Sequence, residues 1–137
     1  MQLCSLLLVF LISLFSGSPT TYTAQGKASF YADRMHGHRT ASGERYDKTK
    51  LTAAHATLPY NTRVLVTNLK NGKTVVVTIN DRMARSRHNI IDLSRAAAKE
   101  LDIVRAGTGS VKLKALGNEE EAQQDAPLSV SEATETR

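Results

Sequence analysis

The chain has 137 residues, with 18 basic and 13 acidic side chains and an apolar fraction of 41%. This length allows one domain with a packed core and excludes two. A single cysteine excludes an internal disulfide framework and a cysteine-based zinc site. No run reaches 18 apolar residues, so we expect no stable membrane insertion. The charge is uneven: residues 1–25 carry none, 26–116 carry a net +10, and 117–137 carry a net −5.

The N-terminal stretch predicts export. Leu6 to Phe15 is apolar apart from Ser13, which is about the length of a signal-peptide core and too short to span a bilayer. Small and turn-forming residues follow it. We therefore interpret residues 1–24 as a signal peptide, cleaved between about Ser16 and Ala24, of a protein of the periplasm or cell envelope. A buried N-terminal strand or helix is the alternative. Lipid anchoring is not expected, because Cys4 precedes the apolar core.

The following residues favour strands. Runs rich in β-branched or alternating apolar residues predict strands at 26–31, 51–55, 63–68, 74–80 and 110–116. Asn71-Gly72 favours a tight hairpin turn between two of them. Ser94 can cap a short helix that extends to Leu101. The polar segment with Gly37 and Gly43 predicts a loop.

These elements predict a mainly β fold. About six strands and one short helix within residues 26–116 suggest a small closed barrel, which leaves no exposed strand edge on a secreted monomer. The acidic segment 117–137 has too few large apolar groups to offset the entropy of ordering, so we expect a disordered tail. A docking role for that tail is the alternative.

Several reactive side chains lie where strands end or in the loops. Asp81 ends the strongest predicted strand, and a carboxyl on such a rigid support suits a general acid. It could equally be a turn or capping residue. Glu44 and Asp47 lie in the long loop, and His55 ends the short strand. Three loop histidines, at positions 36, 38 and 88, lack a clear metal-ligand spacing, so we expect no metal and no cofactor.

Seven stretches of the chain carry a family resemblance. They are Gly26–Tyr31, His36–Asp47, Leu51–Pro59, Thr62–Asn68, Asn71–Lys73, Val77–Arg82 and Ile90–Ala98. In this order and spacing they resemble the RlpA (rare lipoprotein A) family of peptidoglycan lytic transglycosylases. The resemblance implies a six-stranded double-psi β-barrel, a fold related more distantly to expansins.

The resemblance also implies roles for individual residues. Asp81 would be the principal catalytic acid and Glu44 the second catalytic carboxyl. The implied substrate is the glycan strand of peptidoglycan, cleaved between N-acetylmuramic acid and N-acetylglucosamine to leave 1,6-anhydro ends. The residues expected to contact it are Asp47, His55, Arg82, Arg85 and Tyr46.

Two other functions are weighed against this one. The family commonly has Gly-Pro after Asn-Asp-Arg, whereas Met83-Ala84 follows here, which favours a non-catalytic, expansin-like glycan-binding or wall-loosening domain. The basic core alone would also suit nucleic acid, but the export signal argues against that partner. A basic groove would instead concentrate glycan polymers that carry carboxylates or phosphates.

Overall fold

The computed structural model describes residues 21–117. Its elements are β1 (Thr23–Phe30), the 3₁₀ turn η1 (Asp33–Met35), β2 (Thr52–His55), β3 (Arg63–Asn68), β4 (Thr74–Arg82), β5 (Asn89–Leu93), α2 (Arg95–Leu101) and β6 (Gly109–Ala115). The expected signal peptide and acidic tail lie outside the described residues, apart from residues 21–24 and Gly117. Between residues 21 and 117, no helix combines the length and apolar character needed to cross a membrane.

The six strands close into a barrel in the order β1-β5-β2-β4-β3-β6, which confirms the mainly β barrel predicted from the sequence. Two pairs, β1 with β5 and β2 with β4, are parallel, and the remaining neighbours are antiparallel. Each parallel pair contains a register shift, after Lys27 in the first and after Ala53 in the second. Such irregularities re-aim side chains. The second one places Asp81 opposite Ala54.

The barrel interior is filled by the alternating apolar residues of its strands. In β3 and β4, every second side chain is buried, and Val64, Val66, Val77 and Ile79 are fully enclosed. Complete burial of each such side chain stabilises the fold by about 1.5–3 kcal/mol. The strong alternation explains why both strands could be predicted from the sequence.

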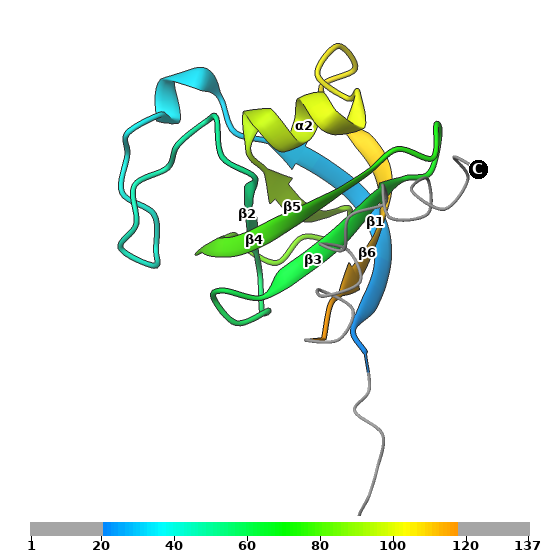
Figure 1. Ribbon diagram of the computed structural model, residues 1–137, viewed down its shortest axis with the longest axis horizontal. Coiled ribbons are helices and arrows are strands. Elements are labelled where there is room, and N and C mark those ends of the chain that lie inside the picture. The colour runs from blue at the N-terminus through cyan, green and yellow to red at the C-terminus, as the bar shows by residue number, and fades with distance from the viewer. Residues whose placement is uncertain (1–20, 118–137) are drawn as a thin grey trace, which may run out of the picture.

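The predicted helix is confirmed as α2. Ser94 is its N-cap: the Oγ atom accepts a hydrogen bond from the N–H of Ala97 at 3.2 Å. Figure 1 shows the helix beside the strands, and its buried residues belong to the same core as theirs. It ends at Asp102, whose backbone is left-handed with a φ of 60°.

Two strand predictions differ from the structure. β1 begins at Thr23, and Thr23 and Ala24 pair with β6, although both were expected in the signal peptide. Cleavage after Ala24 would therefore remove two paired residues of the barrel. No strand is predicted at residues 89–93, where β5 lies. Its polar residues, Asn89 and Asp92, interrupt the apolar pattern. Only the pairing of this segment with β1 and β2 shows that it is a strand.

The predicted tight turn at Asn71-Gly72 is wrong in its length. Five residues connect β3 and β4, and of Asn71 and Gly72 only the glycine has a positive φ, 78°. The loop closes through hydrogen bonds from the Gly72 N–H to the Asn68 carbonyl and from the Asn68 N–H to the Lys73 carbonyl, both 2.8 Å. The side chain of Asn71 binds the end of α2 instead of shaping a two-residue turn.

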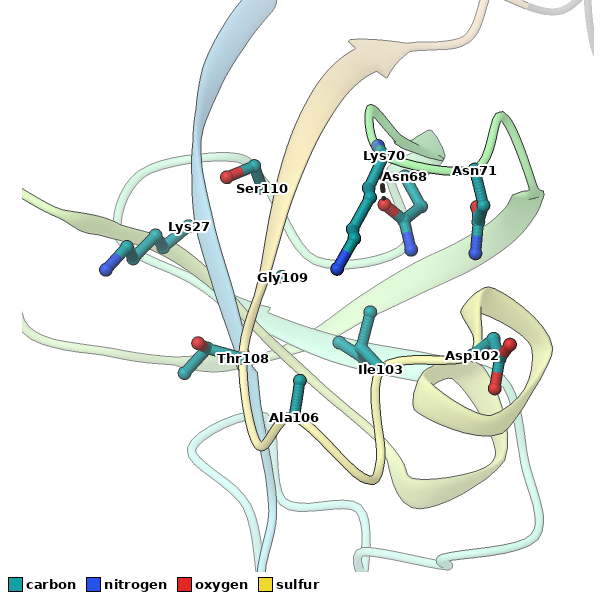
Figure 2. Close-up of a pocket in the computed structure, with 10 residues that line it drawn as sticks. All are labelled: Lys27, Asn68, Lys70, Asn71, Asp102, Ile103, Ala106, Thr108, Gly109 and Ser110. Atoms are coloured by element: carbon teal, nitrogen blue, oxygen red, sulfur yellow. Dashed lines mark hydrogen bonds between the residues drawn. The ribbon is translucent and has the colours of Figure 1, made fainter.

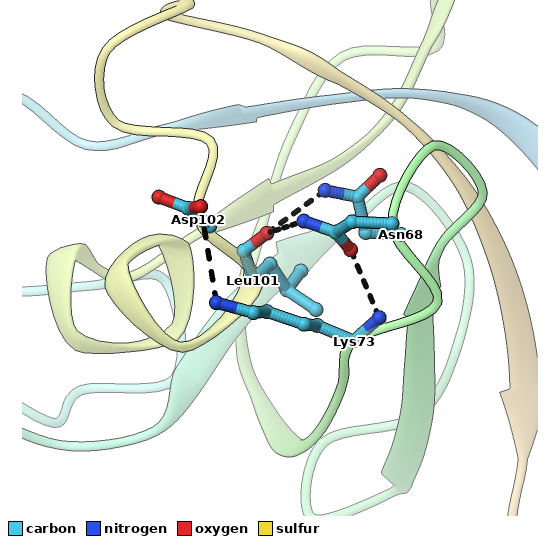
Figure 3. A network of polar contacts seen from close by, with 5 residues as sticks. Asn68, Lys73, Leu101 and Asp102 are labelled. Atoms are coloured by element: carbon cyan, nitrogen blue, oxygen red, sulfur yellow. Dashed lines mark hydrogen bonds and ion pairs between the residues drawn. The ribbon is translucent and has the colours of Figure 1, made fainter.

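This loop and the end of α2 are joined by polar contacts (Figure 3). The Leu101 carbonyl accepts hydrogen bonds from the side-chain amides of Asn68 at 2.8 Å and Asn71 at 3.2 Å, and Lys73 pairs with Asp102. A hollow of about 510 Å³ opens beside this network (Figure 2). It lies at the end of β4 opposite to Asp81, on the order of 20 Å away at the usual rise per strand residue.

Candidate active site

Asp81 lies near the C-terminal end of β4, and the long loop between β1 and β2 reaches it through the backbone of Ala41. Its Oδ1 atom accepts hydrogen bonds from the backbone N–H groups of Ala41 and Arg82, each at 2.8 Å. Its Oδ2 atom accepts the O–H of Tyr31. Donors from three segments therefore hold this side chain. Both of its oxygens act only as acceptors, as in an ionised carboxylate.

The loop reaches Asp81 because it folds back on itself as a small hairpin. Gly37 and Gly43 adopt positive φ angles of 87° and 96°, which side chains rarely allow. The N–H of Thr40 donates to the Glu44 carbonyl at 2.7 Å, and this turn presents the Ala41 N–H to Asp81. Gly37 and Gly43, which the sequence places in this loop, thus allow the turn that brings the Ala41 N–H to Asp81.

The two expected loop carboxylates lie on this hairpin but do different things. Glu44 is exposed, with its side chain available to a ligand at the rim. Asp47 is half-buried, and its carboxylate accepts hydrogen bonds from the Thr49 N–H and hydroxyl. These bonds lower the pKa of Asp47. Among residues 21–117, no hydrogen bond joins the Glu44 carboxylate to Asp81. The structure therefore brings together Asp81 and the loop backbone and leaves Glu44 outside the cluster.

Tyr46 does not have the free ring that a sugar-binding role requires. Its side chain is 2% exposed and stacks on Tyr31, with ring centroids 4.3 Å apart. Its hydroxyl accepts a hydrogen bond from the Arg95 N–H at 3.0 Å. The sequence predicts a substrate contact for Tyr46, whereas in the structure its ring packs against Tyr31 and its hydroxyl binds the start of α2. Burial, and then the hydrogen bond to Asp81, raise the pKa of Tyr31, so its hydroxyl remains a donor.

His55 is also a supporting residue in the structure. The residue is 3% exposed, and its Nδ1 atom accepts hydrogen bonds from the N–H groups of Thr57 and Leu58. Its Nε2 atom lies 3.1 Å from the Tyr22 hydroxyl. Burial, with the nearby charge of Arg82, lowers the pKa of His55 and favours the neutral ring. Both ring nitrogens are engaged within the protein, and the Nδ1 bonds hold the chain that follows β2.

Of the two expected arginines, Arg82 is the last residue of β4 and Arg85 lies in the segment that follows the strand. Arg82 is half-buried, donates from Nη1 to the His55 carbonyl at 3.2 Å, and lies 4.4 Å from the ring centroid of Tyr60. Tyr60 is 37% exposed, which leaves part of this cation–π pair open to a ligand. Arg85 is exposed and lines a shallow hollow of about 260 Å³ next to His55. These two arginines form a basic border next to the C-terminal end of β4.

The structure adds one carboxyl that the sequence did not indicate as functional. Asp92 of β5 is half-buried and accepts a hydrogen bond from the Ser29 hydroxyl at 3.2 Å. Burial raises its pKa, the Ser29 hydrogen bond lowers it, and the nearby charge of Asp81 raises it again. Because no strand was predicted at β5, no sequence pattern indicated a functional role for Asp92. Only the position of β5 in the barrel reveals its proximity to Asp81.

A closed six-stranded barrel with two parallel strand pairs, and with a carboxylate held at the end of one of them, defines a double-psi β-barrel domain. The family model described as lytic transglycolase matches residues 23–113, and the chain belongs to this family. This confirms the family resemblance of the sequence.

Relatives with curated names agree with this assignment. The chain is 50% identical over 93 residues to a Neisseria meningitidis protein and 48% identical over 99 residues to a Vibrio cholerae protein. Both are named endolytic peptidoglycan transglycosylase RlpA. The matches cover 68% and 72% of this chain but only 39% and 38% of the relatives, so this chain corresponds to one part of those proteins.

Solved structures support the fold alone. Streptomyces papain inhibitor aligns with a TM-score of 0.57 at 24% identity, over 70% of this chain and 96% of its own. The apo form of an expansin from Clavibacter michiganensis aligns with the same TM-score of 0.57 at 19% identity, over 71% of this chain and 52% of its own.

Proposed function

We propose that this protein is a lytic transglycosylase of peptidoglycan, with Asp81 as an essential catalytic carboxyl. The reaction cleaves the β-1,4 bond between N-acetylmuramic acid and N-acetylglucosamine. The observation that carries the proposal is the hydrogen-bonded placement of Asp81 at the end of β4, in a chain whose relatives are named as such transglycosylases. The protein would act in the cell envelope, where this polymer lies.

The chemistry requires no water. A carboxylic acid protonates the bridging oxygen, and the bond to C1 of the muramic residue breaks with positive charge developing at C1. A carboxylate close to C1 stabilises that charge. The C6 hydroxyl then closes on C1 and loses its proton, which leaves a 1,6-anhydro end. Help from a general acid or base is worth about 10²–10⁴-fold.

The basic border and the rim residues suit this substrate. Arg82 with the partly exposed ring of Tyr60, and the exposed Arg85, lie next to the C-terminal end of β4, and peptidoglycan carries carboxylates. We propose that these groups bind the glycan strand while Glu44, exposed on the hairpin above Asp81, approaches it from the rim. Asp47, His55 and Tyr46 support the surrounding chain.

The decisive test is the release of anhydro-muropeptides or anhydro-glycan from purified glycan strands, followed by mass spectrometry. Asp81→Asn keeps the shape of the side chain, and we expect release to fall by about 10²-fold or more. Asp102→Asn is the matched control, because it removes a carboxylate at the distant end of α2, where asparagine tolerates a left-handed backbone. Equal release by wild type and Asp81→Asn would contradict the role of Asp81.

Glu44 is tested in the same assay. Glu44→Gln removes the charge of the rim carboxylate without touching the hydrogen bonds of Asp81. If Glu44 takes part in the reaction, turnover falls while glycan binding persists. Unchanged turnover would assign it to the solvated surface.

The second candidate function is a non-catalytic glycan-binding or wall-loosening domain. The residues after Arg82 favour it, because Met83-Ala84 replaces the Gly-Pro of the family at the chain that leaves the site. The fold similarity to an expansin is consistent with it. Retained glycan binding with no cleavage product from the wild-type protein would select this function over the enzyme.

A further inference from the structure

We propose that Asp92 is the catalytic acid of this site and that its Oδ2 atom delivers the proton to the leaving oxygen. Asp81 is then the charged partner that stabilises the cation at C1. This inference rests on the proposed transglycosylase function. It moves the acid role from Asp81, where the family resemblance places it, to a residue on β5.

The strand register places the two carboxyls on one row of the barrel. Asp92 pairs with Ala54 of β2, and Ala54 pairs with Asp81 of β4. Directly paired residues of neighbouring strands project to the same face, and strands lie about 4.8 Å apart. The Cα atoms of the two aspartates are thus about 10 Å apart. The residue between them is an alanine, which is too small to separate their side chains.

The hydrogen bonds of the two carboxyls differ. Both oxygens of Asp81 are held by donors, and a proton on Oδ2 would point at the Tyr31 hydroxyl instead of a ligand. In Asp92, the Ser29 hydroxyl donates to Oδ1. Within residues 21–117, no hydrogen-bond partner is recorded for Asp92 Oδ2. Asp92 therefore has an oxygen that can carry a proton to substrate.

The surroundings of Asp92 favour its protonated form. Burial raises its pKa from the ordinary value of 3.8, and the charge of Asp81 adds to this effect against the hydrogen bond from Ser29. The other titratable groups coupled to Asp92 are Tyr31 and Tyr46, whose pKa values its charge raises in turn. Arg95, at the start of α2, pairs with Asp33 at 3.7 Å instead.

The proton and the electron pairs balance within one turnover. Asp92 transfers its proton to the bridging oxygen as the bond from C1 to that oxygen breaks, and the electron pair stays on the departing oxygen. The ionised Asp92 then takes the proton of the C6 hydroxyl as the C6 oxygen forms its bond to C1. Asp92 ends protonated, as it began, and Asp81 remains charged throughout.

The test compares two substrates: purified glycan strands, and the 4-nitrophenyl glycoside of the N-acetylglucosaminyl–N-acetylmuramic acid disaccharide. Nitrophenolate departs without protonation, so on this substrate Asp92 is not needed as the acid and serves only as the base for the C6 hydroxyl. We expect Asp92→Asn to lose about 10²-fold or more on glycan strands. We expect it to recover at least about tenfold of that loss on the nitrophenyl glycoside. Asp81→Asn should lose the same factor on both substrates, because both develop charge at C1.

The outcomes separate this inference from the proposed function. An active wild type with an equally active Asp92→Asn variant overturns the role of Asp92 alone. An equal loss by Asp92→Asn on both substrates overturns the acid assignment, because it gives Asp92 the same behaviour as Asp81. A wild type that releases no anhydro product overturns the proposed function, and the inference about Asp92 with it.

A second measurement leaves both carboxyls in place. Ser29→Ala removes the hydrogen bond that lowers the pKa of Asp92. A general acid loses activity as the pH rises through its pKa, so the alkaline limb of the rate profile should move to higher pH in this variant. A limb that stays at the wild-type position overturns the acid assignment.

Discussion

Tyr31 and Tyr46 stack on each other, but their hydroxyl groups have different partners. The Tyr31 hydroxyl donates to Asp81, and the Tyr46 hydroxyl accepts from the Arg95 backbone. Tyr31→Phe keeps the ring stack and removes the donor from a charged carboxylate. Such bonds are worth about 1.5–3 kcal/mol, so we expect the rate of glycan cleavage to fall about tenfold or more. Steady-state kinetics on glycan strands measure this.

Tyr46→Phe is the matched control for this prediction. It keeps the same ring contact but leaves the N–H of Arg95, at the first turn of α2, without its acceptor. Thermal stability should decrease while the rate per folded molecule stays near that of the wild type. A larger rate loss in Tyr46→Phe than in Tyr31→Phe would contradict a direct action of Tyr31 on Asp81.

At the scale of elements, His55 joins the end of β2 to the segment that follows it. His55→Ala leaves the N–H groups of Thr57 and Leu58 without the Nδ1 acceptor. Each buried donor left unpaired costs about 1–3 kcal/mol, and Leu58 is buried. We expect a clear decrease in the free energy of unfolding, measured with urea. His55→Asn should keep much of the stability, because its side-chain oxygen can accept the same bonds.

The same ring predicts a dependence of stability on pH. Because burial lowers the pKa of His55, the unfolded chain binds a proton more readily than the folded protein. The contribution of neutral His55 to the free energy of unfolding is therefore fully present above the ordinary pKa of 6.5. It is lost as the pH falls through the lowered pKa of the folded protein. The Asn variant lacks this loss. Equal declines in both proteins below 6.5 would contradict it.

For the whole molecule, the net charge of +10 over residues 26–116 predicts salt-sensitive binding to anionic glycan. Arg85→Ala should weaken binding more at low than at high ionic strength, because screening already removes most of its contribution at high salt. Lys112→Ala is the control: it removes one exposed charge from β6, which lies opposite β2 in the closed barrel. Equal effects of both variants would indicate that only the total charge matters.

Local patterns in the sequence were sufficient for much of this architecture. The alternation of β3 and β4, the Ser94 cap and the loop that contains Gly37 and Gly43 depend on neighbours along the chain, so each could be predicted. The placement of Asp81 at a strand end has the same origin. The family resemblance then supplied the double-psi topology of the barrel and the residue roles, which short-range patterns cannot give.

Barrel closure decided the rest. The burial of His55 and Tyr46, and the position of Asp92 one strand from Ala54 and two from Asp81, follow from pairing between segments far apart in the chain. No sequence pattern around Asp92 indicates that it lies near Asp81. The sequence by itself therefore determined which chemistry the chain could hold, whereas the tertiary structure decided which carboxyls meet, because only strand register brings β5 and β4 to either side of β2.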